Sequence, residues 1–303
     1  MEKKVVAIHD GYRMTKAEKV GQALVCIFLA LLIFLMIYPL WHVAMYSISD
    51  PRLAMKGGLF FWPRGINLYT YSLVFKSKQI WVSFRNTFLK TLLGTGISIL
   101  LSLITAYPLS MKRLRGRGFF SGLIFFTMLF NGGLIPTYLL VRDLHMINTF
   151  WALILPSAMS AYNMFILRNA LAAIPSSLEE SARIDGAGPV RICFQIIAPI
   201  AAPSIAAVAL FYGMGNWNSY LDGLLYTDSN SLQLLQLYLR NVLTQTSSVN
   251  ALMAATGEVS SAYISQTSTQ MAIVTVSTLP ILIVYPWLSR FYVKGLSVGA
   301  VKG

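Results

Sequence analysis

Six apolar segments recur along this 303-residue chain, and each reaches the length of about 20 residues that a helix needs to cross a bilayer. They cover residues 23–48, 86–111, 119–141, 151–171, 197–221 and 271–290. A backbone in lipid must satisfy its hydrogen-bonding groups internally, so segments of this kind fold as helices. The sequence therefore predicts an all-α polytopic membrane protein with six transmembrane helices.

The composition indicates that lipid or other helices surround most of the chain. Hydrophobic residues make up 56% of it and charged residues 12%, whereas about a quarter of the residues in a soluble domain are charged. A soluble protein of this size would need a more highly charged surface. The first apolar segment follows a polar tail, residues 1–22, and precedes five more segments. We therefore interpret it as a membrane span rather than a cleaved signal peptide.

The net charge of +13 fits either a surface that binds nucleic acid or loop charges that orient a membrane protein. The charges cluster between the apolar segments, which favours orientation and no nucleic-acid partner. The densest cluster is Lys112, Arg113, Arg115 and Arg117. The positive-inside rule places this short loop in the cytoplasm. The tails, residues 1–22 and 292–303, are then cytoplasmic, and the loops 49–85 and 222–270 are external.

Several of the predicted spans contain residues that interrupt helices. Asn131, Gly132, Gly133 and Pro136 fall within the third span, and Pro280 and Pro286 fall within the sixth. Membranes tolerate such bends where the freed backbone groups face protein or a water-filled cavity, and ordinary kinks in packed helices explain them equally well. The second external loop contains an apolar-periodic stretch, residues 232–243, that predicts a short helix.

The cytoplasmic loop of residues 175–196 carries strong local signals for a helix. Ser176 with Glu179, and Ser177 with Glu180, each have the spacing of a capping box. Pro175 ends the preceding span. The predicted helix then runs to about residue 184.

A second short helix is predicted to follow a glycine turn. Asp185–Gly186 supplies a residue able to adopt positive φ at the helix end, and Pro189 suits the first position of the next helix, which leads through Pro199 into the fifth span. The charges that project from this helix–turn–helix are Glu179, Glu180, Arg183, Asp185 and Arg191. From the residues alone, docking onto a partner and simple capping of the bundle remain equally open.

The order Glu180-Ser181-Ala182, Asp185-Gly186 and Ile196 to Ala198-Pro199 resembles the E-A-A…G…I-x-L-P loop of ATP-binding-cassette (ABC) importer permeases. Ser181 replaces the usual first Ala and Ala198 the usual Leu. The resemblance implies the type I ABC importer permease fold and makes this loop a coupling helix pair that fits a cleft in an ATPase subunit. In it, Glu180 makes polar contacts, Ala182 and Ala187 pack closely, and Gly186 forms the bend. The coupling residues that it implies are Glu179, Glu180, Ala182, Arg183, Asp185, Gly186, Ala187 and Pro199.

Three further stretches extend the resemblance over almost the whole chain, toward the carbohydrate-uptake branch and its lipoprotein-associated oligosaccharide and polysaccharide permeases. They are Asn131-Gly132-Gly133-Leu134-Ile135-Pro136, Gly215-Asn216-Trp217-Asn218-Ser219-Tyr220, and the ending from Lys294-Gly295 to Gly299-Ala300-Val301-Lys302-Gly303. Ser219 stands where relatives often carry Glu, so no acidic role is carried over to this position.

The resemblance implies a permease subunit of an ATP-driven importer in the bacterial cytoplasmic membrane. It implies a homologous second permease, two cytoplasmic ABC ATPase subunits and an extracellular or lipid-anchored solute-binding protein as partners. Alternating access of the permease pair would move an oligosaccharide or polysaccharide fragment. Specificity in such systems lies largely with the binding protein, so the identity, length and charge of the sugar stay open.

The chain itself is expected to be neither an enzyme nor a holder of cofactors or metals. It has no G-x-x-x-x-G-K-[ST] loop, so ATP and Mg²⁺ are assigned to the partner ATPase. His9, His42 and His145 lack metal-ligand spacing, and Cys26 and Cys193 are interpreted as small buried hydrophobes.

Polar and aromatic residues within the spans are the candidates for a sugar pathway, because sugars bind to aromatic faces, amides and hydroxyls. They are Asn131, Tyr138, Asn163, Asn216, Trp217, Asn218 and Tyr220. Interhelical hydrogen bonds and an interfacial aromatic belt are the alternative roles.

Three other functions remain to be weighed against sugar import. They are an ABC importer of another solute such as amino acids or phosphonate, an ATP-independent secondary transporter or channel, and a membrane enzyme. The sequence shows neither inverted repeats nor a nucleophile–base set within the spans.

Overall fold

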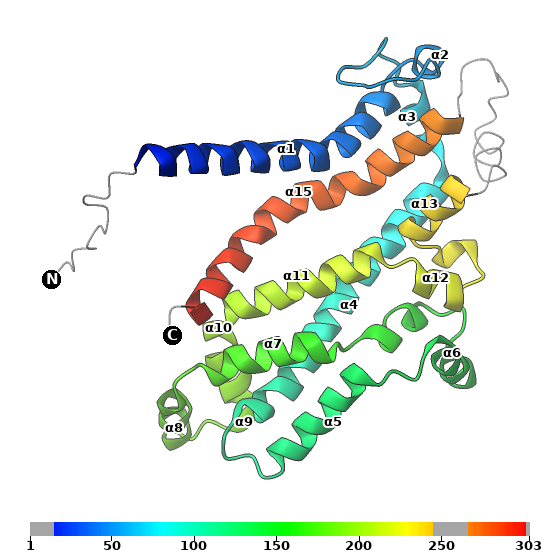
Figure 1. Cartoon of the computed structure of the whole chain (residues 1–303). Helices are drawn as coiled ribbons and strands as arrows, with labels where there is room; N and C mark the ends of the chain where they lie inside the picture. Colours follow the sequence, from blue (N-terminus) through cyan, green and yellow to red (C-terminus); the bar gives the residue numbers. More distant parts are fainter. Residues whose placement is uncertain (1–14, 245–265, 301–303) are drawn as a thin grey trace.

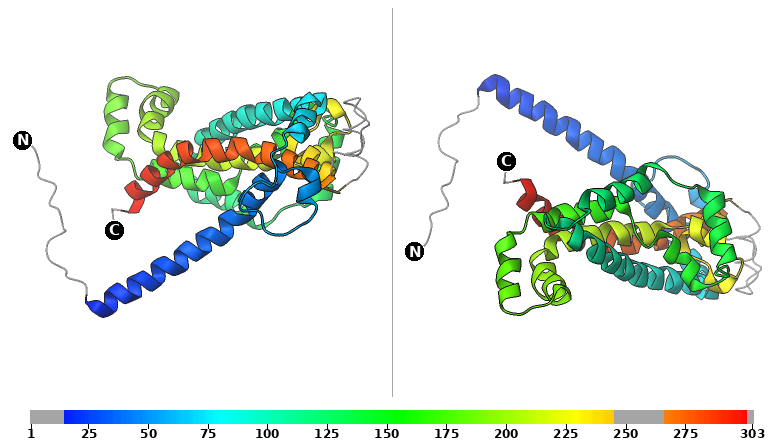
Figure 2. Two further views of the ribbon diagram at one scale, coloured as in Figure 1. Left: turned by 90° about the horizontal axis from the view of Figure 1, so that it is seen from above. Right: turned by 90° about the horizontal axis from the view of Figure 1, so that it is seen from below.

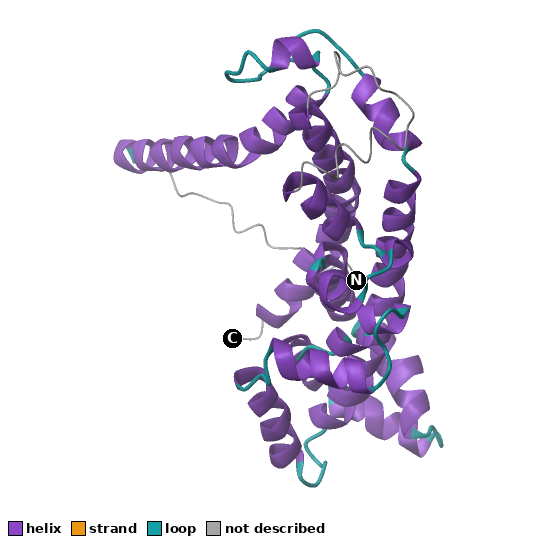
Figure 3. Cartoon of the chain, turned by 90° about the vertical axis from the view of Figure 1, so that its right-hand side faces the viewer, coloured by secondary structure: helices purple, strands orange, loops and turns teal. Residues whose placement is uncertain are grey.

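The computed structural model describes residues 15–244 and 266–300, and this part of the chain is helical without a strand. Figure 3 shows the helices and loops. The elements are α1 (Lys16–Ser47), α2 (Pro51–Ala54), α3 (Tyr69–Lys76), α4 (Lys78–Ser110), α5 (Arg117–Leu129), α6 (Leu134–Asp143), η1 (Phe150–Leu153), η2 (Leu155–Ser157), α7 (Ala161–Ala172), α8 (Ser176–Ile184), α9 (Pro189–Arg191), η3 (Ile192–Ile197), α10 (Ala198–Ile200), α11 (Ala202–Asn218), α12 (Leu221–Tyr226), η4 (Asn230–Leu232), α13 (Leu235–Thr244) and α15 (Gln266–Ala300).

Three helices are long and apolar enough to cross a membrane: α1, α4 and the Gln266–Val284 part of α15. Three further pairs of elements pass the same test together but are sharply bent. The number of candidate spans is therefore three, or up to six if each bent pair crosses as one span. The three helices and the three pairs coincide with the six apolar segments of the sequence.

The third apolar segment, residues 119–141, is not one continuous helix. Helices α5 and α6 meet at an angle of 110°. Gly133 has φ of +90°, a conformation that favours glycine, and its N–H donates to Asn131 Oδ1 at 2.9 Å. The interruption predicted at this Asn-Gly-Gly stretch is thus confirmed as a sharp corner.

The interruption predicted in the sixth segment was wrong. Pro280 and Pro286 lie inside α15, which continues through both; Figure 1 shows one unbroken ribbon. Each proline removes a single backbone donor, and the neighbouring residues keep theirs, so the helix tolerates both.

Helix α4 forms the centre of the bundle, where it packs against α7 and α11, while α11 also packs against α15. Its buried side is rich in small and polar residues, which let neighbouring helices approach closely. This buried stripe includes Ser83, Thr87, Lys90, Gly94, Ser98 and Ser102. One hydrogen bond across the α4–α11 contact joins Ser102 Oγ to the Tyr212 hydroxyl at 2.7 Å.

Replacing Gly94 with alanine should destabilise this helix pair. A Cβ at Gly94 would lie 3.0 Å from Asn216 Nδ2, whereas a Cβ at Gly96 would meet nothing within 4 Å. Overpacking of this kind costs about 1–3 kcal/mol. We expect G94A to lower the unfolding temperature in detergent and the matched control G96A to leave it within about 1 °C of the parent. Equal unfolding temperatures for both variants would contradict this account.

Helix α1 is the element that the bundle covers least. The apolar stretch of α1 has no buried residues, and only Tyr46 and Ser47, at the end of the helix, are buried. Figures 1 and 2 show it projecting away from the other helices, with contact to α15 near its C-terminal end. A capping box between Thr15 and Glu18 starts the helix. The remaining surface of α1 is left to lipid or to another chain.

Short helices gather at the end of the bundle farthest from α8 (Figure 1). We refer to α12, η4 and α13 together as the cap of the bundle. Two side chains of α4 hold it: Asn86 Nδ2 donates to the Ser231 carbonyl at 2.7 Å, and Thr87 Oγ1 accepts from the Leu235 amide at 2.8 Å. The short helix predicted over residues 232–243 is confirmed as α13, which begins three residues later than predicted. These hydrogen bonds hold the cap on the central helix α4.

Candidate functional site

The turn after α8 is a Schellman motif, and it fixes the angle between two short helices. The Ala187 amide donates to the Ala182 carbonyl at 2.9 Å, and the Gly186 amide to the Arg183 carbonyl at 3.0 Å, the two bonds that define the motif. Gly186 has φ of +79°, so the positive φ predicted at this position is confirmed. Pro189 occupies the first turn of α9, also as predicted.

The capping box predicted at the start of α8 was wrong. Pro175 is the N-cap residue, and no side-chain cap forms there within the described chain. The Glu179 carboxylate is used elsewhere, because it accepts from the Tyr107 hydroxyl at 3.2 Å, from Arg183 at 3.0 Å and from Arg113. Two guanidinium groups outcompete a backbone amide for the carboxylate, since charge-assisted hydrogen bonds are the stronger ones.

These contacts make Glu179 a tether between α8 and the end of α4. Its side chain is only 15% exposed, whereas the adjacent Glu180 is exposed. Arg113 comes from the basic cluster of residues 112–117, and Arg117 of the same cluster donates to the Leu109 carbonyl at 2.9 Å. Part of this cluster therefore anchors the loop and the C-terminus of α4.

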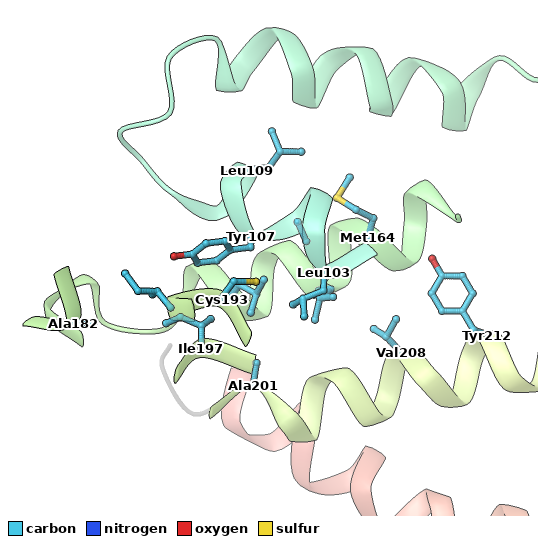
Figure 4. Close-up of a cluster of buried hydrophobic side chains, with 14 residues drawn as sticks. Leu103, Tyr107, Leu109, Met164, Ala182, Cys193, Ile197, Ala201, Val208 and Tyr212 are labelled. Carbon is cyan, nitrogen blue, oxygen red and sulfur yellow. The ribbon is translucent and has the colours of Figure 1, made fainter. Parts of the chain in front are cut away.

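The inner side of the loop packs into the largest core cluster of the protein. Figure 4 shows the meeting point of α4, α7, the loop and α11. Ala182 is buried, and Ala187 is half-buried against the same cluster. The buried members contributed by the loop and α11 include Ala182, Ile192, Cys193, Ile197, Ala201, Val208 and Tyr212. The helix–turn–helix is thus a rigid projection of the bundle rather than a free loop.

The outer side of the loop exposes two apolar side chains that the sequence reasoning missed. Ile184 is 86% exposed and Val190 is 71% exposed, and they flank the glycine turn. Glu180, Arg183 and Asp185 are exposed around them. An apolar residue on the open side of a short charged helix was the signal that could have identified Ile184. Together these residues form a knob with an apolar tip and a charged rim.

A wide turn joins the second short helix to the bundle. Residues Ile192–Ile197 form a π-helical turn, in which the Ala198 amide donates to the Cys193 carbonyl. Pro199 follows, and its ring would clash with the carbonyl four residues earlier; the wider turn relieves this crowding. The chain then turns by 87° into α11. Pro199 itself is exposed at this corner.

The pathway candidates fall into separate surroundings. Asn131 lines a hollow of about 440 Å³, together with Met159, Ser160 and Tyr162, where the breaks of two bent spans come together. Asn163 lies beside it, buried near the start of α7. Tyr138 stacks on Tyr226 with ring centroids 6.4 Å apart.

Asn216 and Trp217 occupy helix contacts. Asn216 lies across Gly94 and donates to Thr95 Oγ1 at 3.5 Å. Trp217 is buried and packs edge-on against Phe84 at 5.8 Å, and its indole N–H has no hydrogen-bond partner among the described residues. These placements fit the alternative role in interhelical packing. Asn218 and Tyr220 line a second hollow, of about 330 Å³, against α13.

An ion pair inside the bundle also escaped the sequence reasoning. Lys90 is fully buried in α4 and donates to Asp222 Oδ2, which also accepts from Ser219 Oγ at 2.6 Å. A lysine within an apolar span was the available signal, because such residues are costly in lipid and need a partner. As for metals, no cluster of three His, Cys, Asp or Glu side chains forms in residues 15–244 and 266–300.

Known proteins resemble this chain along most of its length. The sequence model of the family described as "Binding-protein-dependent transport system inner membrane component" matches residues 80–298. The chain is 36% identical over 276 residues to the polygalacturonan/rhamnogalacturonan transport system permease protein YtcP of Bacillus subtilis (strain 168), covering 91% of this chain and 96% of that protein. It is 34% identical over 290 residues to protein LplC of the same organism, with coverages of 95% and 97%.

A solved structure has a similar fold. It is the crystal structure of a bacterial ABC transporter involved in the import of the acidic polysaccharide alginate. The TM-score is 0.85 with 28% sequence identity, and the match covers 93% of this chain and 100% of that chain.

Proposed function

This chain belongs to the family of binding-protein-dependent transport system inner membrane components, and from that membership we propose that it is the permease subunit of an ATP-driven ABC importer for an oligosaccharide or polysaccharide fragment. The family inferred from the loop motif is therefore confirmed. The names of the relatives support a sugar cargo. One is a polygalacturonan/rhamnogalacturonan transport system permease, and the similar solved structure is that of an ABC transporter involved in the import of alginate.

The observation that carries the proposal is the rigid knob formed by α8 and the turn that follows it. Its helix is tethered through Glu179 and closed by a Schellman turn, and its outer side exposes Ile184 and Glu180. An apolar tip with a charged rim suits insertion into a cleft of another protein. We assign this cleft to a cytoplasmic ATPase subunit, which holds ATP and Mg²⁺. The permease itself carries out no covalent chemistry.

The sidedness of the elements supports cytoplasmic termini. Figure 1 places the first turn of α1, the last turn of α15 and α8 at the same end of the bundle. Docking of α8 onto a cytoplasmic ATPase would put both tails in the cytoplasm, with α12 and α13 at the external side. The basic cluster of residues 112–117 lies at the α8 end too, as the positive-inside rule requires.

In the mechanism that we propose, ATP-driven movement of α8 rocks the bundle between inward- and outward-facing states, with a homologous second permease as its partner. Each state is stabilised by a different ligand, ATP on one side and the loaded binding protein on the other. The hollow beside Asn131 lies where the chain breaks between α5 and α6 and between η2 and α7, and broken helices line substrate sites in many transporters. The sugar would pass along this hollow between the two permeases.

Replacing Ile184 with aspartate should weaken binding of the ATPase. A fully buried apolar side chain contributes about 1.5–3 kcal/mol, so we expect at least about a tenfold loss of ATPase co-purified with the permease. The matched control is Ile66→Asp, because Ile66 is 77% exposed and lies in the loop between α2 and α3, at the opposite end of the bundle. ATP-dependent uptake in proteoliposomes should fall together with ATPase binding. Uptake that survives depletion of ATP, or normal ATPase binding by I184D, would contradict the proposal.

A further inference from the structure

We propose that the hollow between the end of α11 and α13 binds the carboxylate of an acidic, uronate-containing oligosaccharide, with Arg240 as the anion-binding group. The inference rests on the proposed function, because it assigns a substrate class to a sugar importer. It adds a second candidate substrate site, separate from the hollow beside Asn131, at the end of the bundle opposite to α8.

The hollow combines an aromatic face, a cation and amides within one small volume. It measures about 330 Å³ and is lined by residues that include Asn218, Tyr220, Gln236 and Arg240. The Arg240 guanidinium carbon lies 5.6 Å from the centre of the Tyr220 ring. This cation–π contact positions the guanidinium while leaving its N–H groups without a hydrogen-bond acceptor among the described residues.

The charge of the hollow is positive. Among the described residues that line it, Arg240 is the charged one and none is acidic. Asp222, two positions after Tyr220, is the nearest carboxylate along the chain, and it is already bound by Lys90 and Ser219. It therefore compensates the buried lysine rather than Arg240. A neutral sugar would leave the guanidinium unpaired, whereas a carboxylate would pair with it.

Helix α13, which carries Arg240, is held in place by the buried side of the helix, opposite to the hollow. Leu235, Tyr238 and Val242 of α13 are buried in the core, and the Leu235 amide is bound by Thr87 of α4. Gln236 and Arg240 are four residues apart and so share the opposite side of the helix. A site on a rigid element loses little conformational freedom when it binds a ligand.

The size and chemistry of the hollow suit one acidic sugar unit. Its volume is at the low end of the roughly 300–1,000 Å³ typical of ligand pockets, so it accommodates the end of a chain. Tyr220 offers a face to the sugar C–H groups, and the amides of Asn218 and Gln236 offer partners for its hydroxyls. The planar guanidinium matches a carboxylate with two parallel hydrogen bonds.

The test compares an acidic sugar with its uncharged form in the assembled transporter, reconstituted with its second permease, ATPase subunits and binding protein. The probes are trigalacturonate and its methyl ester. We expect Arg240→Gln to lower the rate of trigalacturonate uptake about tenfold, the effect of losing one charge-assisted pair, and to change uptake of the ester less than about twofold. Arg240→Lys should retain an intermediate rate for the acid. The matched control Lys56→Gln removes an exposed charge at the same end of the bundle and should change neither rate.

Several outcomes would overturn the inference. Equal losses for the acid and the ester in R240Q, unchanged uptake of the acid in R240Q, or the same loss in K56Q would each exclude a specific carboxylate contact. A parent transporter that imports neutral oligosaccharides but not trigalacturonate would overturn the acidic substrate class and leave sugar import standing. ATP-dependent uptake of no saccharide at all would overturn both.

Discussion

Replacing Gly186 with proline is expected to abolish ATP-dependent uptake while the protein remains in the membrane at normal abundance. Gly186 has φ of +79°, and its amide donates to the Arg183 carbonyl at 3.0 Å. Proline fixes φ near about −65° and has no N–H, at a cost of about 3 kcal/mol or more. The Schellman turn would therefore open, and Ile184 and Glu180 would lose their fixed position relative to the bundle.

The expected loss is large because, in the mechanism that we propose, coupling depends on a single rigid geometry of the loop. A cost of about 3 kcal/mol lowers the population of the docked turn by roughly two orders of magnitude. Gly186→Asn is the matched control, since asparagine tolerates positive φ and should keep most of the uptake. The measurements are sugar uptake and sugar-stimulated ATPase activity in proteoliposomes, with membrane abundance checked by immunoblot. Normal stimulated ATPase activity in G186P would refute a coupling role for the turn.

The features of the loop that could be predicted from the sequence are local ones. Gly186 and Pro189 determine their own backbone geometry, so their roles follow from residue type and spacing. The capping box failed because the Glu179 carboxylate binds Arg113 and Tyr107, which lie 66 and 72 positions earlier in the chain. A sequence pattern does not reveal a distant partner that competes for the same oxygen atoms.

The same distinction explains the outcome for the membrane segments. Their existence follows from hydrophobic length alone, and all six coincide with helical elements. The path of the chain at each break does not follow from hydrophobic length. Asn131–Gly133 produces a corner of 110°, whereas Pro280 and Pro286 leave α15 continuous. Glycine and asparagine permit a second conformation, and packing decides whether it is used. A proline removes one donor and crowds the carbonyl four residues earlier, and α15 continues as a helix through both of its prolines.

The candidate pathway residues also lie in surroundings that their sequence neighbourhood does not reveal. Asn216 and Trp217 are next to Asn218 in sequence, yet they face α4 and the core, while Asn218 lines a hollow. A helix turns by about 100° per residue, so adjacent polar residues point to different surroundings. Arg240, which completes the second hollow, comes from α13 and has no motif around it that would identify it.

Replacing Lys90 with methionine is expected to destabilise the folded protein by about 3–5 kcal/mol, the cost of breaking a buried ion pair. Lys90 is fully buried and Asp222 is 23% exposed. The pair joins the central helix α4 to α12, which begins the cap on that end of the bundle. Without the lysine, the Asp222 carboxylate keeps only the Ser219 hydroxyl as a partner among the described residues.

The double variant K90M/D222L separates the charge from the shape of this site. Replacing both members of a buried pair by apolar residues is often neutral, so the double variant should recover most of the unfolding temperature that K90M loses. Arg142→Met is the matched control, because Arg142 pairs with Asp143 at 2.9 Å on an exposed surface and such pairs contribute about 1 kcal/mol or less. Thermal unfolding in detergent, followed by size-exclusion chromatography, measures all three variants. If D222L fails to rescue K90M, or if R142M costs as much as K90M, the ion pair does not hold the cap, and the hydrogen bonds from Asn86 and Thr87 must suffice to fasten it.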